Sequence, residues 1–318
     1  MVHLPAAVPP PACDAYFGVR GKMSNWKTVA VLFVGLVLVA QGVAAQESVL
    51  FAYRKAIEKR IRESQADVAI SFLTLDGKTQ YFFRADDAFH AASTMKIPVM
   101  IELFHQVKER RLRLTDTLNI HNQFRSIVDN APYALDPNDD SEKDLYEAEG
   151  ETRELGSLCE LMITKSSNLA TNLLIERLGV EDIRATVRSL GADGMHVLRG
   201  VEDQKAYEQG LNNTTTARGL QVLLTGIADG EVVDEDSCRA MIAILEKQNF
   251  NEGIPAGLPR GTRVAHKTGE ITNIHHDAAI VYAPRPFVLV VLVRGIIDQK
   301  DSAALIADIT KMLYEAVE

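Results

Sequence analysis

The chain has 318 residues, of which 47% are hydrophobic and 24% charged, and its formal net charge is −9. This composition is ordinary for a globular protein and excludes a chain that is disordered throughout. The acidic balance argues against a nucleic acid as partner, because proteins that bind nucleic acids carry basic patches. A chain of this length can bury a large core and has room for two lobes.

The beginning of the chain is typical of an export signal. Two lysines precede an apolar run over residues 29–40, and small residues of the kind that signal peptidase prefers end at Ala45. We therefore expect cleavage near Ala45, a leader over residues 1–45, and a secreted or periplasmic protein. Because Met23 offers a second start, residues 1–22 fit a misassigned beginning. The alternative is an uncleaved anchor, but the run is shorter than the roughly 20 residues that span a bilayer, so we expect no stable membrane insertion.

Helix and strand patterns follow the leader. Residues 47–63 have apolar side chains at the spacing of an amphipathic helix. Residues 68–75 and 80–84 read as two strands, and Asp76-Gly77 between them is a strong hairpin signal.

Strand patterns return late in the chain, at residues 277–282 and 287–294, and residues 302–317 are again helical by spacing. Strands near both ends with helices between them predict one antiparallel sheet built from distant segments. We expect an α/β fold in which helices flank this sheet, beside an all-helical lobe, with the ligand site in the cleft between lobes. The expected ranges are 46–91 with 251–318 for the α/β lobe, and 92–250 for the helical lobe with a loop at 195–216.

Metal and disulfide chemistry have little support. Cys159 and Cys238 follow the leader, and an oxidising compartment would permit a disulfide between them, although a buried free thiol is the expected state of Cys159. No cysteine spacing of the zinc type occurs. The adjacent histidines His275 and His276 lie on an expected strand and would point to opposite faces. We therefore expect no metal and no cofactor.

Three short motifs lie in one order along the chain, and the first is Ser93-Thr94-Met95-Lys96. Apolar residues over 97–107 have helical spacing, so Ser93 and Lys96 would share one helix face. An amine near a serine hydroxyl can activate it as a nucleophile, and a helix N-terminus favours an oxyanion. The alternative is that Ser93 is only a helix N-cap and Lys96 a solvated first-turn residue.

The second motif is Ser166-Ser167-Asn168, and the third is His266-Lys267-Thr268-Gly269 on an expected strand at 264–267. A strand edge beside a nucleophile can offer a backbone N–H, and Gly269 would let a flat substrate approach that backbone. Taken singly, the second motif could be a polar helix-turn junction and the third a surface turn.

Together the three motifs resemble those of the penicillin-recognising serine acylases, which include class A β-lactamases and penicillin-binding proteins. The resemblance implies that Ser93 is the nucleophile and that Lys96 manages protons. It also implies that Ser166 passes a proton to the leaving lactam nitrogen, and that Asn168 holds Lys96 and a substrate amide. The family has aspartate where this chain has Ser167.

The same resemblance implies the substrate contacts of the third motif. Lys267 would supply positive charge, Thr268 would bind the substrate carboxylate, and Gly269 would give room to the substrate. The backbone N–H of Glu270 would join that of Ser93 in an oxyanion hole. Many class A enzymes add an arginine on the next strand, where this chain has His276, a hypothetical titratable substrate contact.

A β-lactamase must also hydrolyse its acyl-enzyme, for which class A enzymes use a loop glutamate. Arg199 and the threonines at 214–216 resemble the ends of that loop, which makes Glu202 the candidate base. Glu202 lies one residue later than in the family, and Ala206 replaces the expected asparagine. Glu202 could instead be an ion-pair partner that fixes the loop.

The predicted function is a secreted serine β-lactamase that acts on a small-molecule β-lactam or peptidoglycan-like substrate. One alternative is a D-alanyl-D-alanine peptidase or esterase of the same fold. Another is a slowly deacylating covalent penicillin binder. A polar span at 129–154 lengthens the gap between the first two motifs and is either a loop at the cleft rim or a solvated excursion. By resemblance we expect a monomer.

Overall fold

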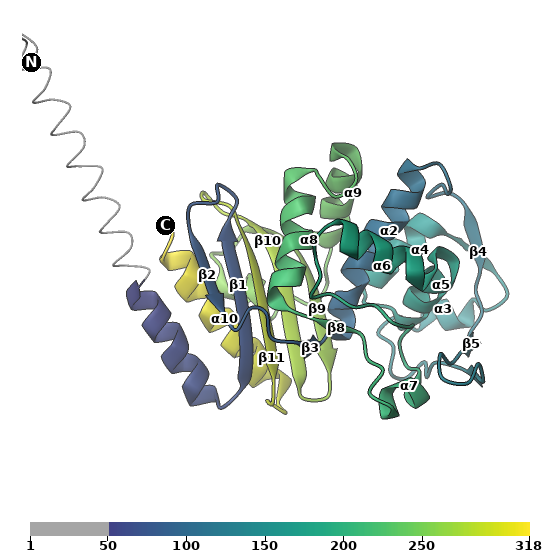
Figure 1. Ribbon diagram of the computed structural model, residues 1–318, viewed down its shortest axis with the longest axis horizontal. Helices are drawn as coiled ribbons and strands as arrows, with labels where there is room; N and C mark the ends of the chain where they lie inside the picture. Colours follow the sequence, from purple (N-terminus) through teal and green to yellow (C-terminus); the bar gives the residue numbers. More distant parts are fainter. Residues whose placement is uncertain (1–50) are drawn as a thin grey trace, which may run out of the picture. The chain divides into compact units, whose positions relative to one another are not determined.

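The computed structural model describes residues 51–318, and the leader and cleavage site expected within residues 1–45 lie outside them. Five strands form an antiparallel sheet in the order β2-β1-β11-β10-β9 (Figure 1). Their bounds are Asp67–Thr74 for β1, Gln80–Phe83 for β2, Arg263–Ile271 for β9, Ile274–Tyr282 for β10 and Phe287–Arg294 for β11. The sheet therefore joins segments from both ends of the described chain.

The hairpin between β1 and β2 forms where the sequence predicts it. Gly77 has a φ of +70°, a conformation that glycine adopts without a steric penalty. The Asp76 carboxylate accepts a hydrogen bond from the Lys78 N–H at 3.0 Å, and the Thr74 N–H donates to the Thr79 carbonyl at 2.9 Å. The turn thus fixes the β1–β2 register.

Both faces of the sheet are covered by helices. Residues 51–64 are helical and, with α10 (Gln299–Glu315), share one apolar core with alternate residues of the strands. The other alternate residues face α8 (Ala217–Asp229) and the remaining helices. Because neighbouring strand residues point to opposite faces, the continuous apolar run of β11 is buried on both sides.

The remaining helices gather beyond β9 (Figure 1). They are α2 (Lys96–Lys108), α3 (Asp144–Glu147), α4 (Leu155–Thr164), α5 (Asn168–Leu178), α6 (Val180–Ser189), α7 (Gln204–Glu208) and α9 (Glu235–Leu245). Two 3-10 helices are η1 (Ala92–Met95) and η2 (Ile254–Gly257). Short strands pair as β3 (Phe89–His90) with β8 (Thr214–Thr215), β4 (Thr117–Asn119) with β7 (Thr152–Glu154), and β5 (Phe124–Arg125) with β6 (Pro132–Tyr133).

The expected fold class is confirmed: an antiparallel sheet flanked by helices, with further helices beside it. The lobe boundaries stay a prediction. They placed residues 217–229 in the helical lobe, and in the structure this segment is α8, which packs on β1, β10 and β11. No helix within residues 51–318 is long and apolar enough to cross a membrane.

Candidate active site

Ser93 lies in the 3-10 turn η1, immediately before α2. The N-cap positions of η1 and α2 are Ala91 and Met95, neither with a side-chain capping bond, so the interpretation of Ser93 as a helix cap is wrong. Ala92 before it has a φ of 45°, an unusual conformation for a residue with a Cβ atom. Ser93 is half-buried and lines a cavity of about 430 Å³.

Lys96 is fully buried, which rules out a solvated first-turn role. Its Nζ donates hydrogen bonds to the Ser166 carbonyl at 2.7 Å, the Ser166 Oγ at 3.2 Å and the Asn168 Oδ1 at 2.9 Å. Among the described residues it has no hydrogen bond to Ser93 Oγ. The structure therefore joins the first motif to the second through this amine.

A second buried amine reaches the same hydroxyl. Lys267 Nζ donates to Ser166 Oγ at 3.0 Å and to the Thr268 carbonyl at 2.8 Å. Ser166 has a φ of 56°, so its position between Lys96 and Lys267 depends on a strained backbone. All three motifs consequently meet at one serine oxygen.

Burial changes the protonation of both amines. It lowers the pKa of Lys96 to about 7, although the nearby charges of Asp140 and Glu202 act in the opposite direction. The pKa of Lys267 lies well below its ordinary value, because of burial first and repulsion from Lys96 second. Near neutral pH part of the Lys96 population is therefore a neutral amine, which can donate only two of its three hydrogen bonds and keeps a lone pair that can act as a base.

Asn168 bridges Lys96 and Glu202. It is the first residue of α5, and its Nδ2 donates to the Glu202 Oε1 at 2.8 Å while its Oδ1 accepts from Lys96. Ser167, which replaces the family's aspartate, caps the helix by accepting the Ala170 N–H at 3.2 Å.

Glu202 lies in the same cavity as Ser93. Its second oxygen accepts the Asp136 N–H at 3.2 Å, and burial is the main cause that raises its pKa. Its φ is 61°, so Glu202 is the third residue at the site, after Ala92 and Ser166, with a positive φ. Within residues 51–318 Glu202 has no ion-pair partner, so the ion-pair alternative is not supported.

The loop that carries Glu202 is fastened by Asn172, a residue that the sequence analysis missed. Asn172 Oδ1 accepts the Val201 N–H at 2.7 Å, and its Nδ2 donates to the Val201 carbonyl at 3.1 Å. A Cβ atom on Gly200 would lie 2.5 Å from Asn172 Oδ1, so this close approach requires glycine. The sequence offered one indication of this role: Asn172 lies one helical turn after Asn168, on the same face of α5, which is buried.

The third motif lies on β9, an edge strand that contacts η1. A Cβ atom on Gly269 would lie 3.0 Å from Thr94 Cγ2 and 3.1 Å from the Thr94 nitrogen. Gly269 therefore lets η1, the turn that carries Ser93, pack closely against β9. The sequence had instead suggested that this glycine makes room for a substrate. Thr268 and Glu270 line a second cavity of about 240 Å³ together with Ser93.

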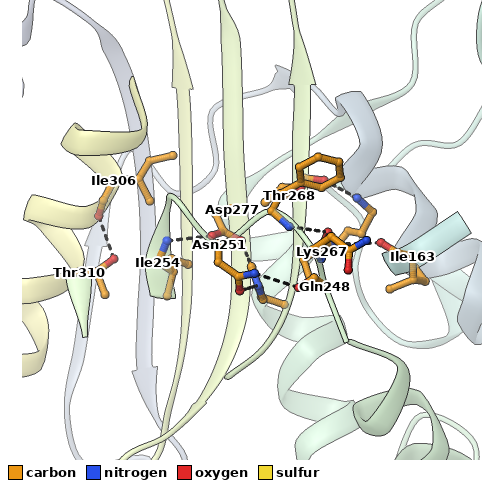
Figure 2. A network of polar contacts seen from close by, with 12 residues as sticks. Ile163, Gln248, Asn251, Ile254, Lys267, Thr268, Asp277, Ile306 and Thr310 are labelled. Atoms are coloured by element: carbon orange, nitrogen blue, oxygen red, sulfur yellow. Dashed lines mark hydrogen bonds and ion pairs between the residues drawn. The ribbon is translucent and has the colours of Figure 1, made fainter. Parts of the chain in front are cut away.

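A polar network behind the site connects the second and third motifs. Asp277 accepts the Ile254 N–H at 2.8 Å and contacts the buried His266 ring at 2.9 Å. Gln248 Nε2 donates to the Ile163 carbonyl at 2.9 Å, near the end of α4 (Figure 2). The segment between Gln248 and Ile254 thus holds the sheet against the helix that leads to Ser166.

The hypothesis that His276 contacts substrate is wrong. The side chain is fully buried, and its Nδ1 accepts the Val293 N–H at 3.1 Å, which leaves Nε2 as the donor to the His90 carbonyl at 2.9 Å. Burial lowers its pKa to about 4. His276 is therefore a neutral structural residue at physiological pH.

The structure also bears on the expectations for disulfide and metal chemistry. Cys159 and Cys238 are buried and free, so they form no disulfide with each other, and burial raises the pKa of Cys159 to about 12. In the part of the chain that the structure describes, no group of three or more His, Cys, Asp or Glu side chains could hold a metal ion.

The fold and this site define a class. A sheet edge, a serine turn and two buried amines around a second serine are the arrangement expected of penicillin-recognising serine hydrolases. A model of the β-lactamase enzyme family matches residues 52–317, and the chain belongs to that family. Its enzyme type is a serine hydrolase, a β-lactamase of the class A kind.

Individual relatives agree with this assignment. The β-lactamase ROB-1 of Haemophilus influenzae is 25% identical over 265 residues, which cover 80% of this chain and 82% of the relative. The β-lactamase structure from Sphaerobacter thermophilus is 27% identical, with a TM-score of 0.72, over 83% of this chain and 96% of the other. A PBP-A variant, solved as an acyl-enzyme complex with penicillin G, is 28% identical, with a TM-score of 0.72. The match covers 84% of this chain and 97% of the PBP-A chain.

Proposed function

We propose that the protein is exported and hydrolyses β-lactams through an acyl-enzyme on Ser93. Ser93 attacks the lactam carbonyl, and Lys96 accepts its proton as a neutral amine. The backbone N–H groups of Ser93 and Glu270 stabilise the oxyanion, a contribution worth about 3 to 4 kcal/mol per donor in enzymes of this type. Thr268, which lines the smaller cavity with Ser93, binds the substrate carboxylate, and the buried Lys267 amine supports it from behind through its bonds to Ser166 Oγ and the Thr268 carbonyl.

The observation that carries this proposal is the environment of Ser166 Oγ. A serine hydroxyl has two acceptor lone pairs and one hydrogen. Both acceptor positions are used by the amines of Lys96 and Lys267, at 3.2 and 3.0 Å. Because Ser166 also lines the cavity that contains Ser93, its hydrogen is free to point at a leaving nitrogen held there. The arrangement supports a proton path from Ser93 through Lys96 and Ser166 to the opened ring.

Deacylation is assigned to Glu202. Its carboxylate shares the cavity with Ser93 and is oriented by the side chain of Asn168 and the backbone of Asp136. A carboxylate held in this way can activate a water molecule that attacks the ester.

A metal-free assay with a chromogenic cephalosporin, combined with intact-protein mass spectrometry, tests the function. Fast turnover with little accumulated adduct is the expected result. A long-lived adduct without turnover would favour a penicillin binder, and neither signal would favour a peptidase or esterase. The penicillin binder is the second candidate because the chain is as similar to PBP-A as to the β-lactamase structures, at 27% identity and a TM-score of 0.71.

The rate of acylation is expected to rise with pH through a midpoint near 7. Lys96 must be neutral to accept the proton, and burial places its pKa at about 7, so the rate is low below this pH and levels off above it. Burial of the amine is the main cause of this low pKa, and the charges of Asp140 and Glu202 act against it. The measurement is kcat/KM for the cephalosporin from pH 5 to 9. In the Lys96→Met variant the residual activity should lack this rise; a parent-like rise would contradict the role of Lys96.

The cavity is acidic, which predicts a preference among substrates. Four carboxylates line it, from Asp139, Glu202, Asp203 and Glu270, against the single guanidinium of Arg199, and burial lowers the pKa of His90. A β-lactam with an ammonium side chain should react better than one with a carboxylate side chain, by about fivefold for about 1 kcal/mol of attraction.

The comparison of kcat/KM for ampicillin and carbenicillin measures this preference. The Glu270→Gln variant should reduce it, since one of the cavity carboxylates is lost. Asp193→Asn, at an exposed position outside the cavity, is the matched control. Equal values for the two substrates in the parent would contradict the prediction.

A further inference from the structure

The second motif lacks the aspartate of the family, yet the structure places a carboxylate beside it. Asp140, from the polar span at 129–154, is only 4% exposed. Its Oδ2 accepts the Asn168 N–H at 2.8 Å and the Leu169 N–H at 3.0 Å, and it lies 3.4 Å from Ser167 Oγ. A side chain 27 positions upstream in the sequence thus binds the segment at which the family's aspartate is missing.

The polar span is fastened to this segment by further contacts. The Tyr146 hydroxyl donates to Asp140 Oδ2 at 2.9 Å, and the Ser141 hydroxyl donates to the Lys165 carbonyl. Lys165 also forms an ion pair with Glu142 at 3.4 Å, in which Glu142 is nearly buried. These bonds make residues 140–146 part of the wall that supports the second motif, whereas much of the rest of the span is exposed.

We propose that Asp140 takes the place of the missing aspartate and is a positioning residue of the reaction. It holds the first N–H groups of α5, and thereby the Ser166 carbonyl and the Asn168 amide that orient Lys96. A carboxylate is suited to this position because free N–H groups and the positive end of the helix dipole favour negative charge. The proposal rests on the proposed function, since it concerns the same reaction.

The position of Asp140 has two separable consequences. Its hydrogen bonds fix the backbone that carries Ser166 and Asn168, and a small displacement of such groups can reduce a rate by about a hundredfold. Its charge favours the protonated form of Lys96, so that removal of the charge should shift the rise of kcat/KM to lower pH.

Four variants test the proposal. Asp140→Ala removes both effects, and Asp140→Asn removes the charge but keeps an acceptor oxygen. Ser167→Asp restores the family's residue, alone and combined with Asp140→Ala. Asp144→Ala, an exposed carboxylate in the same span, is the control. The measurements are kcat/KM against pH, thermal unfolding, and amide hydrogen exchange at Asn168 and Leu169.

Asp140→Ala should reduce kcat/KM by about tenfold or more and speed exchange at both amides. Loss of a cap should lower the melting temperature by about 2 to 4 °C. Asp140→Asn should keep most of the rate but move the pH midpoint downward. Ser167→Asp alone should be harmful, because two carboxylates then share one site, whereas it should rescue the Asp140→Ala variant. The control should behave as the parent.

Parental kcat/KM and pH midpoint in Asp140→Ala, with only the melting temperature reduced, would overturn the proposal, as would failure of Ser167→Asp to rescue. If the parent itself gave neither turnover nor adduct, the proposed function would be refuted. In that case hydrogen exchange at Asn168 and Leu169 would still decide whether Asp140 positions this segment.

Discussion

Replacement of Ser93 by alanine is expected to abolish both turnover and the covalent adduct while the protein stays folded. Alanine removes the hydroxyl that forms the acyl-enzyme in the proposed reaction, so kcat should fall by at least about a thousandfold. The stability should change by less than about 0.5 kcal/mol, because Ser93 is half-buried and caps neither η1 nor α2. Intact-protein mass spectrometry with benzylpenicillin, turnover of a chromogenic cephalosporin and thermal unfolding measure the three quantities.

The control for this change is Ser157→Ala, at an exposed position on α4, which should keep parental activity. An adduct that still forms in Ser93→Ala would show that another residue is acylated, and Ser166 in the same cavity would be the first to examine. Retained turnover would remove the whole assignment of the three motifs.

Replacement of Glu202 by glutamine is expected to separate the two halves of the reaction. Glutamine keeps an oxygen that can accept from Asn168 or Asp136, but it cannot remove a proton from water. Acylation should continue, and deacylation should slow by about a hundredfold to ten-thousandfold, the usual contribution of a general base. The acyl-enzyme should therefore accumulate, and its mass should be stable over minutes.

The control here is Glu208→Gln, an exposed residue at the end of α7 in the same loop. Turnover of the Glu202 variant at the parental rate would show that deacylation uses another base. The pH dependence adds a second criterion, since burial raises the pKa of Glu202. Deacylation in the parent should then be lost, as pH falls, at a higher pH than for an ordinary glutamate, because the base must be ionised.

The sequence predicted those parts of the fold that depend on patterns within a few consecutive residues. Asp76-Gly77 between two alternating segments predicted the β1–β2 hairpin, and the apolar β-branched run at 287–294 predicted a buried strand. These patterns work because turn conformation and side-chain alternation are properties of a few consecutive residues. Expectations at the ends of elements were less accurate: the strand expected at 264–267 extends to Ile271, since pairing with β10 continues to Ile271 opposite Ile274.

The candidate site was only partly accessible in this way. The sequence by itself determined which motifs are present and in which order, and hence the family and the residues of the predicted chemistry. Only the tertiary structure decided that Lys96 is buried against Ser166 and that His276 is fully buried. It also decided that Asn172 binds Val201 and that Asp140 binds the first N–H groups of α5. The physical reason is that burial and hydrogen bonds between residues far apart in the chain depend on how the helices pack on the edge of the sheet, and spacing along the chain carries no record of that packing.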